Sequence, residues 1–134
     1  TAAKQAPGII DRRQRLTDAR PEDCRVLSGG DGMPLEVMRR GGDGLISVAA
    51  NAFPQRFMAC VNRAKQGDFE GAEEAYACLD EAVQALFEEG NPVGVKTALA
   101  EMGKILPTMR LPLVEGTERL HAKFRELIRK YDLR

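Results

Sequence analysis

The chain has 134 residues, of which 43% are hydrophobic, so it is long enough for a domain with a hydrophobic core and too apolar for a disordered segment. Its 20 basic and 20 acidic residues give a formal net charge of zero, which excludes a global field that would draw the chain to nucleic acid. Its apolar runs are all shorter than the roughly 20 residues of a membrane-spanning helix, so neither nucleic acid nor a membrane is expected as a partner.

The first half of the chain alternates short apolar runs with segments of helical character. The apolar runs cover residues 1–4, 25–28 and 45–48. This order is typical of successive strand–helix units, whose strands pair into a parallel sheet. The first run ends at Lys4, and the second leads into Gly29. In such folds the functional groups gather at the carboxyl ends of the strands, so we look for the site there.

Three helices are predicted between and after these strands, at residues 10–17, 33–40 and 54–67. Prolines near the start of the second and third helices, and glycines at their ends, mark the boundaries. The third helix is predicted to be amphipathic. Its apolar face consists of Phe57, Met58, Val61 and Ala64.

From Asp68 onward the pattern becomes wholly helical. Asp68 is a favourable N-cap for a helix of about 20 residues that ends at Gly90. Asn91 and Pro92 are predicted to be the N-cap and first residue of the next helix, which ends at Gly103. The long helix carries an apolar stripe that packs within the chain or against a partner. The stripe consists of Phe69, Tyr76, Val83 and Phe87.

A last helix is predicted at residues 117–130, after an extended segment. Its spacing places four apolar residues on one face. These are Leu120, Phe124, Leu127 and Ile128. His121, on the same helix, is predicted to be an ordinary surface residue.

Three parallel strands with helices after each would form an open sheet with unpaired edges. A strand–helix barrel needs about 250 residues, and three of its eight units with a helical tail account for about half of that. We therefore predict an α/β fold that is the carboxyl-terminal part of a (β/α)8 barrel. Residues 1–67 would form the last three units and residues 68–134 a helical carboxyl-terminal domain.

Lys4 suits Schiff-base chemistry, because a neutral lysine amine attacks carbonyl carbons and enzymes favour that form by desolvation or nearby positive charge. From the spacing alone, an ordinary solvated lysine at a strand end is the commoner explanation. The turn that contains Gly29 could bring main-chain groups close to a small anion, although a turn that needs positive φ explains the glycines too. Ile46 is predicted to have a core side chain, so that only its carbonyl could face a substrate.

Three cysteines, with no metal-ligand spacing between them, indicate reduced thiols in a cytoplasmic protein. They are Cys24, Cys60 and Cys78. Neither a metal nor a cofactor is predicted.

Several strings taken together resemble the dihydrodipicolinate synthase family, a branch of the pyruvate-dependent aldolases. Residues 3–8 are similar to the family's lysine-bearing sixth strand. Residues 27–31 and 41–51 are similar to its next two strand ends. Residues 87–96 and 110–113 resemble stretches of its helical tail. The resemblance covers essentially the whole chain.

The resemblance implies a lyase that condenses pyruvate with aspartate 4-semialdehyde in lysine (diaminopimelate) biosynthesis. Lys4 aligns with the residue that forms the imine with pyruvate, Ile46 with the residue whose carbonyl faces pyruvate, and Gly29 with a glycine on the second-substrate side. The family's proton-relay tyrosines and carboxylate-binding arginine precede the lysine, so residues 1–134 alone are expected to be inactive. Family members are commonly homotetramers, and we expect one here.

Two alternatives stay open. Gln5 stands where the family usually has Glu, and Gly30 replaces an acidic residue, so the second substrate could be that of an N-acetylneuraminate lyase or a keto-deoxy-sugar aldolase. A non-catalytic helical interaction module would account for residues 68–130, but it leaves Lys4 and the glycine-rich turns unexplained.

Overall fold

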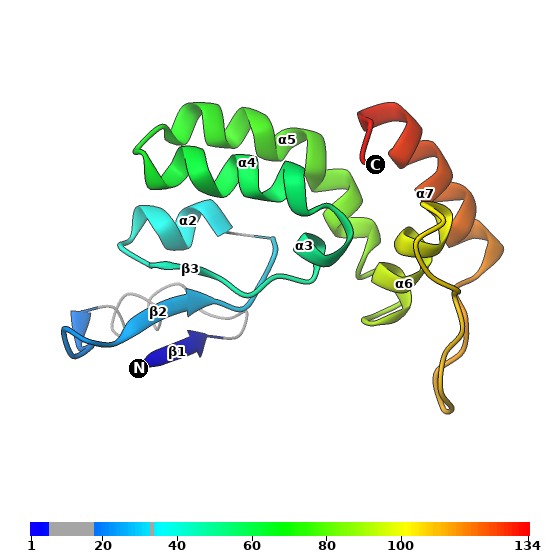
Figure 1. Cartoon of the computed structure of the whole chain (residues 1–134), viewed down its shortest axis with the longest axis horizontal. Helices are drawn as coiled ribbons and strands as arrows, with labels where there is room; N and C mark the ends of the chain where they lie inside the picture. The colour runs from blue at the N-terminus through cyan, green and yellow to red at the C-terminus, as the bar shows by residue number, and fades with distance from the viewer. Residues whose placement is uncertain (6–17, 33) are drawn as a thin grey trace.

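A computed structural model describes residues 1–5, 18–32 and 34–134. Its strands form one parallel sheet in the order β1-β2-β3, so the α/β prediction is confirmed (Figure 1). The strands are β1 (Ala2–Gln5), β2 (Arg25–Ser28) and β3 (Gly44–Leu45). The helix predicted at residues 10–17 lies outside the described residues.

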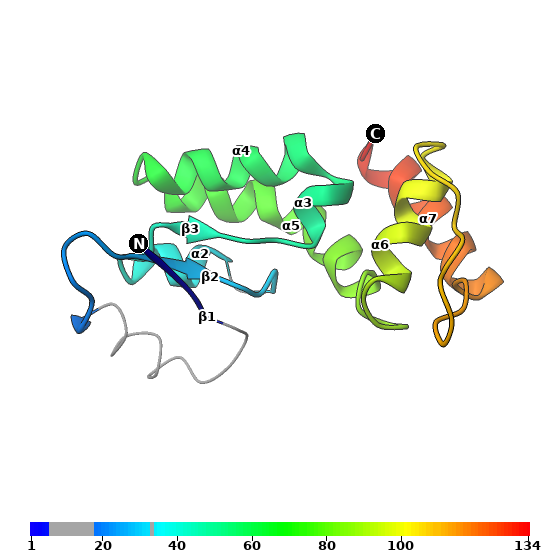
Figure 2. The same cartoon turned by 60° about the horizontal axis from the view of Figure 1, so that its bottom comes forward.

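The helices cover one side of the sheet and extend beyond it. In chain order they are α2 (Pro34–Arg39), α3 (Ala49–Ala52), α4 (Pro54–Lys65), α5 (Phe69–Ala85), α6 (Val93–Glu101) and α7 (Glu118–Tyr131). In Figure 1, α2 lies between the sheet and the paired helices α4 and α5, while α6 and α7 stand at the far end of α5. Figure 2 shows the same separation between the strands and the last two helices. Among the described residues, no helix has the length and apolar character needed to cross a membrane.

β3 is shorter than predicted, since the strand expected at residues 45–48 ends at Leu45. The N–H of Ile46 still donates to the carbonyl oxygen of Ser28, with an N–O distance of 2.8 Å. Beyond that bond β2 itself has ended, at Ser28. The N–H of Val48 bonds instead to a side chain, so the backbone ladder stops.

Asp43, just before β3, joins that strand to β2 through its side chain. Its Oδ2 atom accepts a hydrogen bond from the Val26 N–H at 2.7 Å and forms an ion pair with Arg20. The bond from Val26, with the positive charge of Arg20 beside it, lowers the pKa of Asp43 below its ordinary value of 3.8. The folded sheet therefore favours the ionised form of the Asp43 carboxylate.

α4 buries Phe57, Val61 and Ala64 as predicted, but Met58 is 46% exposed, so its assignment to the apolar face is wrong. Successive helical residues are about 100° apart, and position 58 therefore points away from the face shared by 57, 61 and 64. α5 begins at Phe69, soon after α4 ends. Asp68 caps α5 as predicted, because its Oδ1 atom accepts from the Gly71 N–H at 2.9 Å.

α6 begins at Val93, one residue later than predicted. Pro92 is the N-cap and no side-chain capping bond is formed, so the expected capping by Asn91 is wrong. The first turn of α6 passes very close to the backbone of Leu86 at the end of α5. A Cβ atom at Gly94 would lie 2.1 Å from the carbonyl oxygen of Leu86. Only glycine allows the start of α6 to contact the end of α5 this closely.

α7 confirms its prediction in most respects. Thr117 caps it, with Oγ1 accepting from the Leu120 N–H at 3.4 Å. The four residues predicted to be buried are buried. The exposed position predicted for His121 is wrong: its side chain is 15% exposed and its Nδ1 lies 2.6 Å from Oε1 of Glu101, on α6.

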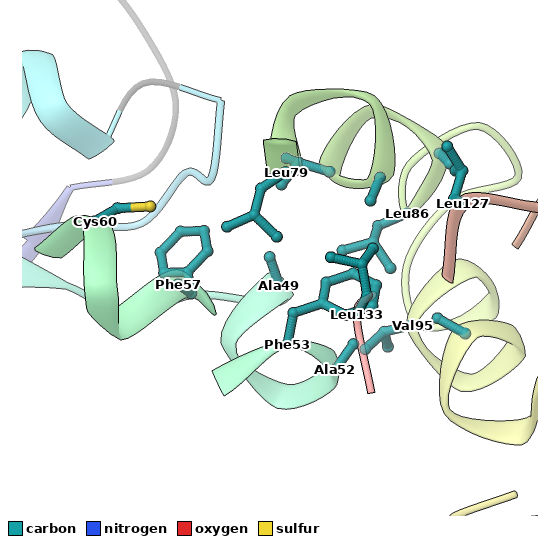
Figure 3. Close-up of a cluster of buried hydrophobic side chains, with 14 of the residues drawn as sticks. Ala49, Ala52, Phe53, Phe57, Cys60, Leu79, Leu86, Val95, Leu127 and Leu133 are labelled. Atoms are coloured by element: carbon teal, nitrogen blue, oxygen red, sulfur yellow. The ribbon is translucent and has the colours of Figure 1, made fainter. Parts of the chain in front are cut away.

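The hydrophobic core lies mainly among the helices. One cluster of buried side chains extends from α2 to Leu133 near the end of the chain. Figure 3 shows Phe53, Leu86 and Leu133 together where α3, α5 and the carboxyl terminus meet. Each of these side chains is at most 2% exposed, and burying such a side chain contributes about 1.5–3 kcal/mol.

Candidate functional site

The three predicted site residues lie at one end of the sheet. In the strand register Lys4 pairs with Leu27, and Leu27 pairs with Gly44. Paired residues in neighbouring strands point to the same face, so these three share a face of the sheet. Gly29 and Ile46 are the first residues after the carboxyl ends of β2 and β3. Lys4, Gly29 and Ile46 therefore belong to the carboxyl-end edge of the sheet.

This face is the open one among the described residues. Val26 and Ser28, which alternate with Leu27, are each 1% exposed and point toward the packed side. Lys4 is exposed, and Ile46 is 51% exposed. The core side chain predicted for Ile46 is therefore not found among the described residues, where more than half of that side chain is exposed.

The turn after β2, residues 28–31, is called the glycine turn below. The Oγ atom of Ser28 is 3.4 Å from the Gly30 nitrogen, from which it accepts, and 3.2 Å from the Gly30 carbonyl oxygen, to which it donates. Asp31, at the end of the turn, is 3% exposed. Its Oδ2 atom accepts from the N–H groups of Val48 and Ala49 at 2.9 and 3.0 Å. One carboxylate thus joins the glycine turn to the turn after β3.

The backbone that follows Ile46 is held by a second set of bonds. Ser47 Oγ accepts from the Ala50 N–H at 2.8 Å. The side-chain amide of Asn51 donates to the carbonyl oxygens of Ser47 and Val48, each at 3.2 Å. These bonds close the turn on itself, so the main chain at Ile46 is attached on one side to β2 and on the other to a capped turn.

Asp31 is absent from the residues that the sequence predicts for the site. A signal for it exists, since the first N–H groups of a helix have no partner within the helix and favour a carboxylate. The N–H groups in question belong to Val48 and Ala49, 17 and 18 residues further along the chain. Spacing alone does not show that these segments meet.

The chemical groups along this edge are a primary amine and the main-chain groups of two turns. An amine can attack a carbonyl carbon, and main-chain N–H and C=O groups can orient a small polar substrate. In the described part of the chain, no three residues of the types His, Cys, Asp and Glu stand together as a metal site would require. Burial raises the pKa of the Cys60 thiol, which fits a packing role for that residue.

Hollows are also found elsewhere on the described part of the molecule. One of about 340 Å³ runs along the outer edge of β3, between Leu45 and the α4 residues Phe57 and Val61. Another of about 760 Å³ lies along α7, beside Arg125 and Arg129. Neither of these two hollows is lined by Lys4, Gly29 or Ile46.

Comparison with known proteins identifies the protein family of this chain. The sequence model of the Dihydrodipicolinate synthetase family matches residues 1–131. The chain belongs to this family. The resemblance predicted from the sequence strings is therefore confirmed across almost the whole chain.

Relatives within the dihydrodipicolinate synthetase family agree in sequence and in structure. The chain is 41% identical over 131 residues to the 4-hydroxy-tetrahydrodipicolinate synthase of Methanocaldococcus jannaschii, covering 97% of the chain and 44% of that protein. It matches the crystal structure of dihydrodipicolinate synthase from Aquifex aeolicus with a TM-score of 0.93 and 36% identity, covering 98% and 45% of the two chains.

A third relative is the chloride-inhibited dihydrodipicolinate synthase of Acinetobacter baumannii, solved in complex with pyruvate. It matches with a TM-score of 0.90 and 34% identity, covering 98% of this chain and 45% of that one. The chain spans less than half the length of these members of the family. Its parallel sheet and helices therefore have the α/β fold of part of a larger family structure.

Proposed function

We propose that the chain carries the imine-forming and substrate-lining strand ends of a (β/α)8-barrel lyase. This enzyme condenses pyruvate with aspartate 4-semialdehyde to give 4-hydroxy-tetrahydrodipicolinate, in lysine (diaminopimelate) biosynthesis. The observation that supports the proposal is the position of Lys4, Gly29 and Ile46 at or just beyond the carboxyl ends of the three strands, in a member of the dihydrodipicolinate synthetase family. The names of the curated relatives and the pyruvate bound to one solved relative support the choice of substrates.

The proposed reaction begins at Lys4. Its Nζ atom attacks the ketone carbon of pyruvate, and loss of water leaves an imine. Loss of a proton from the pyruvate methyl group gives an enamine, whose terminal carbon attacks the aldehyde carbon of the second substrate. The amino group of that substrate then adds to the imine carbon and expels the Lys4 amine. This last step closes the ring and regenerates the enzyme.

Gly29 and Ile46 act through the main chain in this proposal. The carbonyl group of Ile46 faces bound pyruvate, and Gly29 lines the side on which the aldehyde enters. Asp31 supports both roles, because its carboxylate holds the end of the glycine turn to the N–H groups of Val48 and Ala49. Two turns that are fixed to each other can hold two substrates at a constant separation, as an addition reaction requires.

The proposal also assigns each part of the chain a place in the complete barrel. Residues 1–67 form the last three units of the barrel, and residues 68–134 form its helical carboxyl-terminal domain. The hollow along the outer edge of β3, with the exposed side chain of Met58 beside it, is a surface that another barrel strand would cover. The complete enzyme is a cytoplasmic homotetramer in this proposal.

Imine trapping tests the role of Lys4. The natural full-length protein, incubated with pyruvate and borohydride, should gain the mass of one reduced pyruvate adduct on the peptide that contains Lys4. Lys4→Arg should abolish the adduct, because arginine keeps the charge but does not lose its proton at ordinary pH. The control is Lys96→Arg, whose native ammonium donates to the Thr108 carbonyl oxygen away from the sheet. It should leave trapping unchanged.

An adduct that survives Lys4→Arg would overturn the assignment of the nucleophile. The second substrate is tested separately. The wild-type enzyme that forms the imine with pyruvate is supplied with aspartate 4-semialdehyde, N-acetylmannosamine and sugar-derived aldehydes. Turnover of aspartate 4-semialdehyde alone supports the proposal, and preference for a sugar aldehyde would contradict it.

A further inference from the structure

Tyr76, on α5, reaches across the molecule to the glycine turn. Its hydroxyl donates a hydrogen bond to the carbonyl oxygen of Asp31, with an O–O distance of 2.7 Å between residues 45 positions apart. Its ring packs edge-on against Phe57, with ring centroids 6.4 Å apart. The sequence predicts Tyr76 only as part of an apolar stripe. The structure shows that its polar end has a specific partner.

The hydroxyl of Tyr76 is a permanent donor. Burial, with the negative charges of Asp80 and Asp31 nearby, raises the pKa of Tyr76 far above its ordinary value of 10.0. The proton therefore stays on the oxygen throughout the pH range in which enzymes work. A buried tyrosine hydroxyl without a partner would cost free energy, so this bond fixes the side chain as well as the turn.

Asp31 is the point where these contacts converge. Its carbonyl oxygen accepts from Tyr76, and its Oδ2 atom accepts from Val48 and Ala49. Its other carboxylate oxygen is buried and has no hydrogen-bond partner among the described residues. The position of Asp31, and with it the end of the glycine turn, therefore depends on the bond from α5 and on the bonds to the turn after β3.

We propose that Tyr76 is a positioning residue, whose hydroxyl holds the glycine turn so that the main chain at Gly29 is placed for the second substrate. The link is indirect, since Tyr76 bonds to Asp31 and Asp31 ends the turn that contains Gly29. The kinetic consequence of this inference rests on the proposed function. The structural consequence, that α5 holds the turn, does not.

The experiment compares Tyr76→Phe with Tyr131→Phe in the natural full-length protein. Phenylalanine keeps the ring that packs on Phe57 and removes only the hydroxyl. Tyr131 is a matched control, because its hydroxyl donates to Glu81 at 2.9 Å on the exposed surface. Tyr76→Phe should raise the KM for aspartate 4-semialdehyde roughly two- to tenfold, the factor that corresponds to one ordinary hydrogen bond. The kcat and the KM for pyruvate should stay within about twofold of the wild type, and Tyr131→Phe should change none of these.

Amide hydrogen exchange supplies a readout that needs no activity. Tyr76→Phe should speed exchange at residues 29–31 and 48–49, relative to both the wild type and Tyr131→Phe. An unchanged KM for the aldehyde in an active enzyme would overturn the inference, and so would equal effects on kcat and on both KM values. If the wild type does not condense the two substrates, the proposed function fails. The exchange rates then decide the positioning role, and unchanged exchange would overturn it.

Discussion

Two aspartates stand at opposite ends of the contact between β2 and β3. Asp43, at the amino end, accepts from the Val26 N–H, and Asp31, at the carboxyl end, accepts from Val48 and Ala49. β3 pairs through only two residues, so the backbone ladder alone holds it weakly. The two carboxylates extend that ladder with side-chain bonds at both of its ends. Hydrogen bonds to charged groups contribute about 1.5–3 kcal/mol, more than neutral ones.

The pH dependence of stability should show the contribution of Asp43. Because its pKa is lowered in the folded state, the ionised carboxylate stabilises the fold fully above the ordinary value of 3.8. That stabilisation is lost as the pH falls through the lowered folded-state pKa. Asp43→Asn should therefore reduce the free energy of unfolding by about 1 kcal/mol at pH 7, and the difference from the wild type should shrink in acid.

Urea unfolding of the natural protein at pH 7 and at several values below pH 4 measures this difference. Asp132→Asn is the control, since that side chain is 89% exposed and lies 3.6 Å from Arg56. It should have little effect, as exposed ion pairs contribute little. A penalty for Asp43→Asn that is the same at neutral and acid pH would show that the carboxylate charge is not what stabilises the sheet.

At the level of elements, α5 connects the two ends of the molecule. It packs on α4 along its length, carries Tyr76 toward the sheet and meets α6 at Leu86. Its amino end is fixed by the Asp68 carboxylate, which bonds the Gly71 N–H. Losing this cap would free the first turn of the helix that supports the site.

Removing the cap should destabilise the protein by a predictable amount. Asp68→Ala should lower the free energy of unfolding by about 1 kcal/mol, the usual cost of an N-cap replaced by alanine. Asp68→Asn keeps an oxygen that can accept from Gly71, so it should retain most of the stability. Urea unfolding followed by far-ultraviolet circular dichroism compares the variants. Equal losses in both would argue that the charge of Asp68, and not its capping bond, is what matters.

Helices were the elements most accessible to prediction, because their signals are local. The periodicity of α7 identified its four buried residues, and Asp68 and Thr117 marked the starts of two helices. The length of β3 could not be predicted in this way, because a strand ends where its partner ends and β2 ends at Ser28. The four-residue helix α3 is also too short to have a periodic pattern.

The site was predictable to the extent that strand ends carry it. The order of strands points to Lys4, the family resemblance points to Gly29 and Ile46, and their roles stay predictions; the structure places all three at or just beyond the carboxyl ends of strands. Asp31 and Tyr76 do not follow, because each acts on backbone groups that are distant in sequence. A tyrosine in an apolar stripe does carry one hint: its hydroxyl needs a partner if it is buried.

At the scale of the whole molecule, the described residues expose apolar surface in more than one place. Beside β3, Met58 on α4 and Ile46 just after the strand are about half exposed. Another such place is the segment between α6 and α7. Its exposed apolar side chains are Ile105, Leu106, Leu111, Leu113 and Val114. Apolar surface of this kind, together with strand edges that have no partner in the described part of the chain, favours association.

A polypeptide of residues 1–134 alone should therefore self-associate and not remain a monomer. Light scattering measures this directly, over a range of protein concentrations. Met58→Lys should weaken association, because it places a charge in the apolar surface beside β3 at a position exposed enough to tolerate it. A clean monomer that unfolds cooperatively would contradict the prediction. It would mean that the exposed apolar segments are not attractive enough to bring two copies together.

The distribution of the core has a consequence for how the protein comes apart. Among the described residues, the buried cluster draws its members from the helices, from Phe53 and Leu86 next to helix ends and from Leu133, and the sheet touches it only through Leu45 at its margin. Parts of a protein with few buried contacts open locally at a lower free energy than the whole. The sheet, which includes Lys4 on β1, would then unfold locally and transiently while the helical core stays folded. Lys4 thus lies on the layer of the described chain that the buried cluster anchors least.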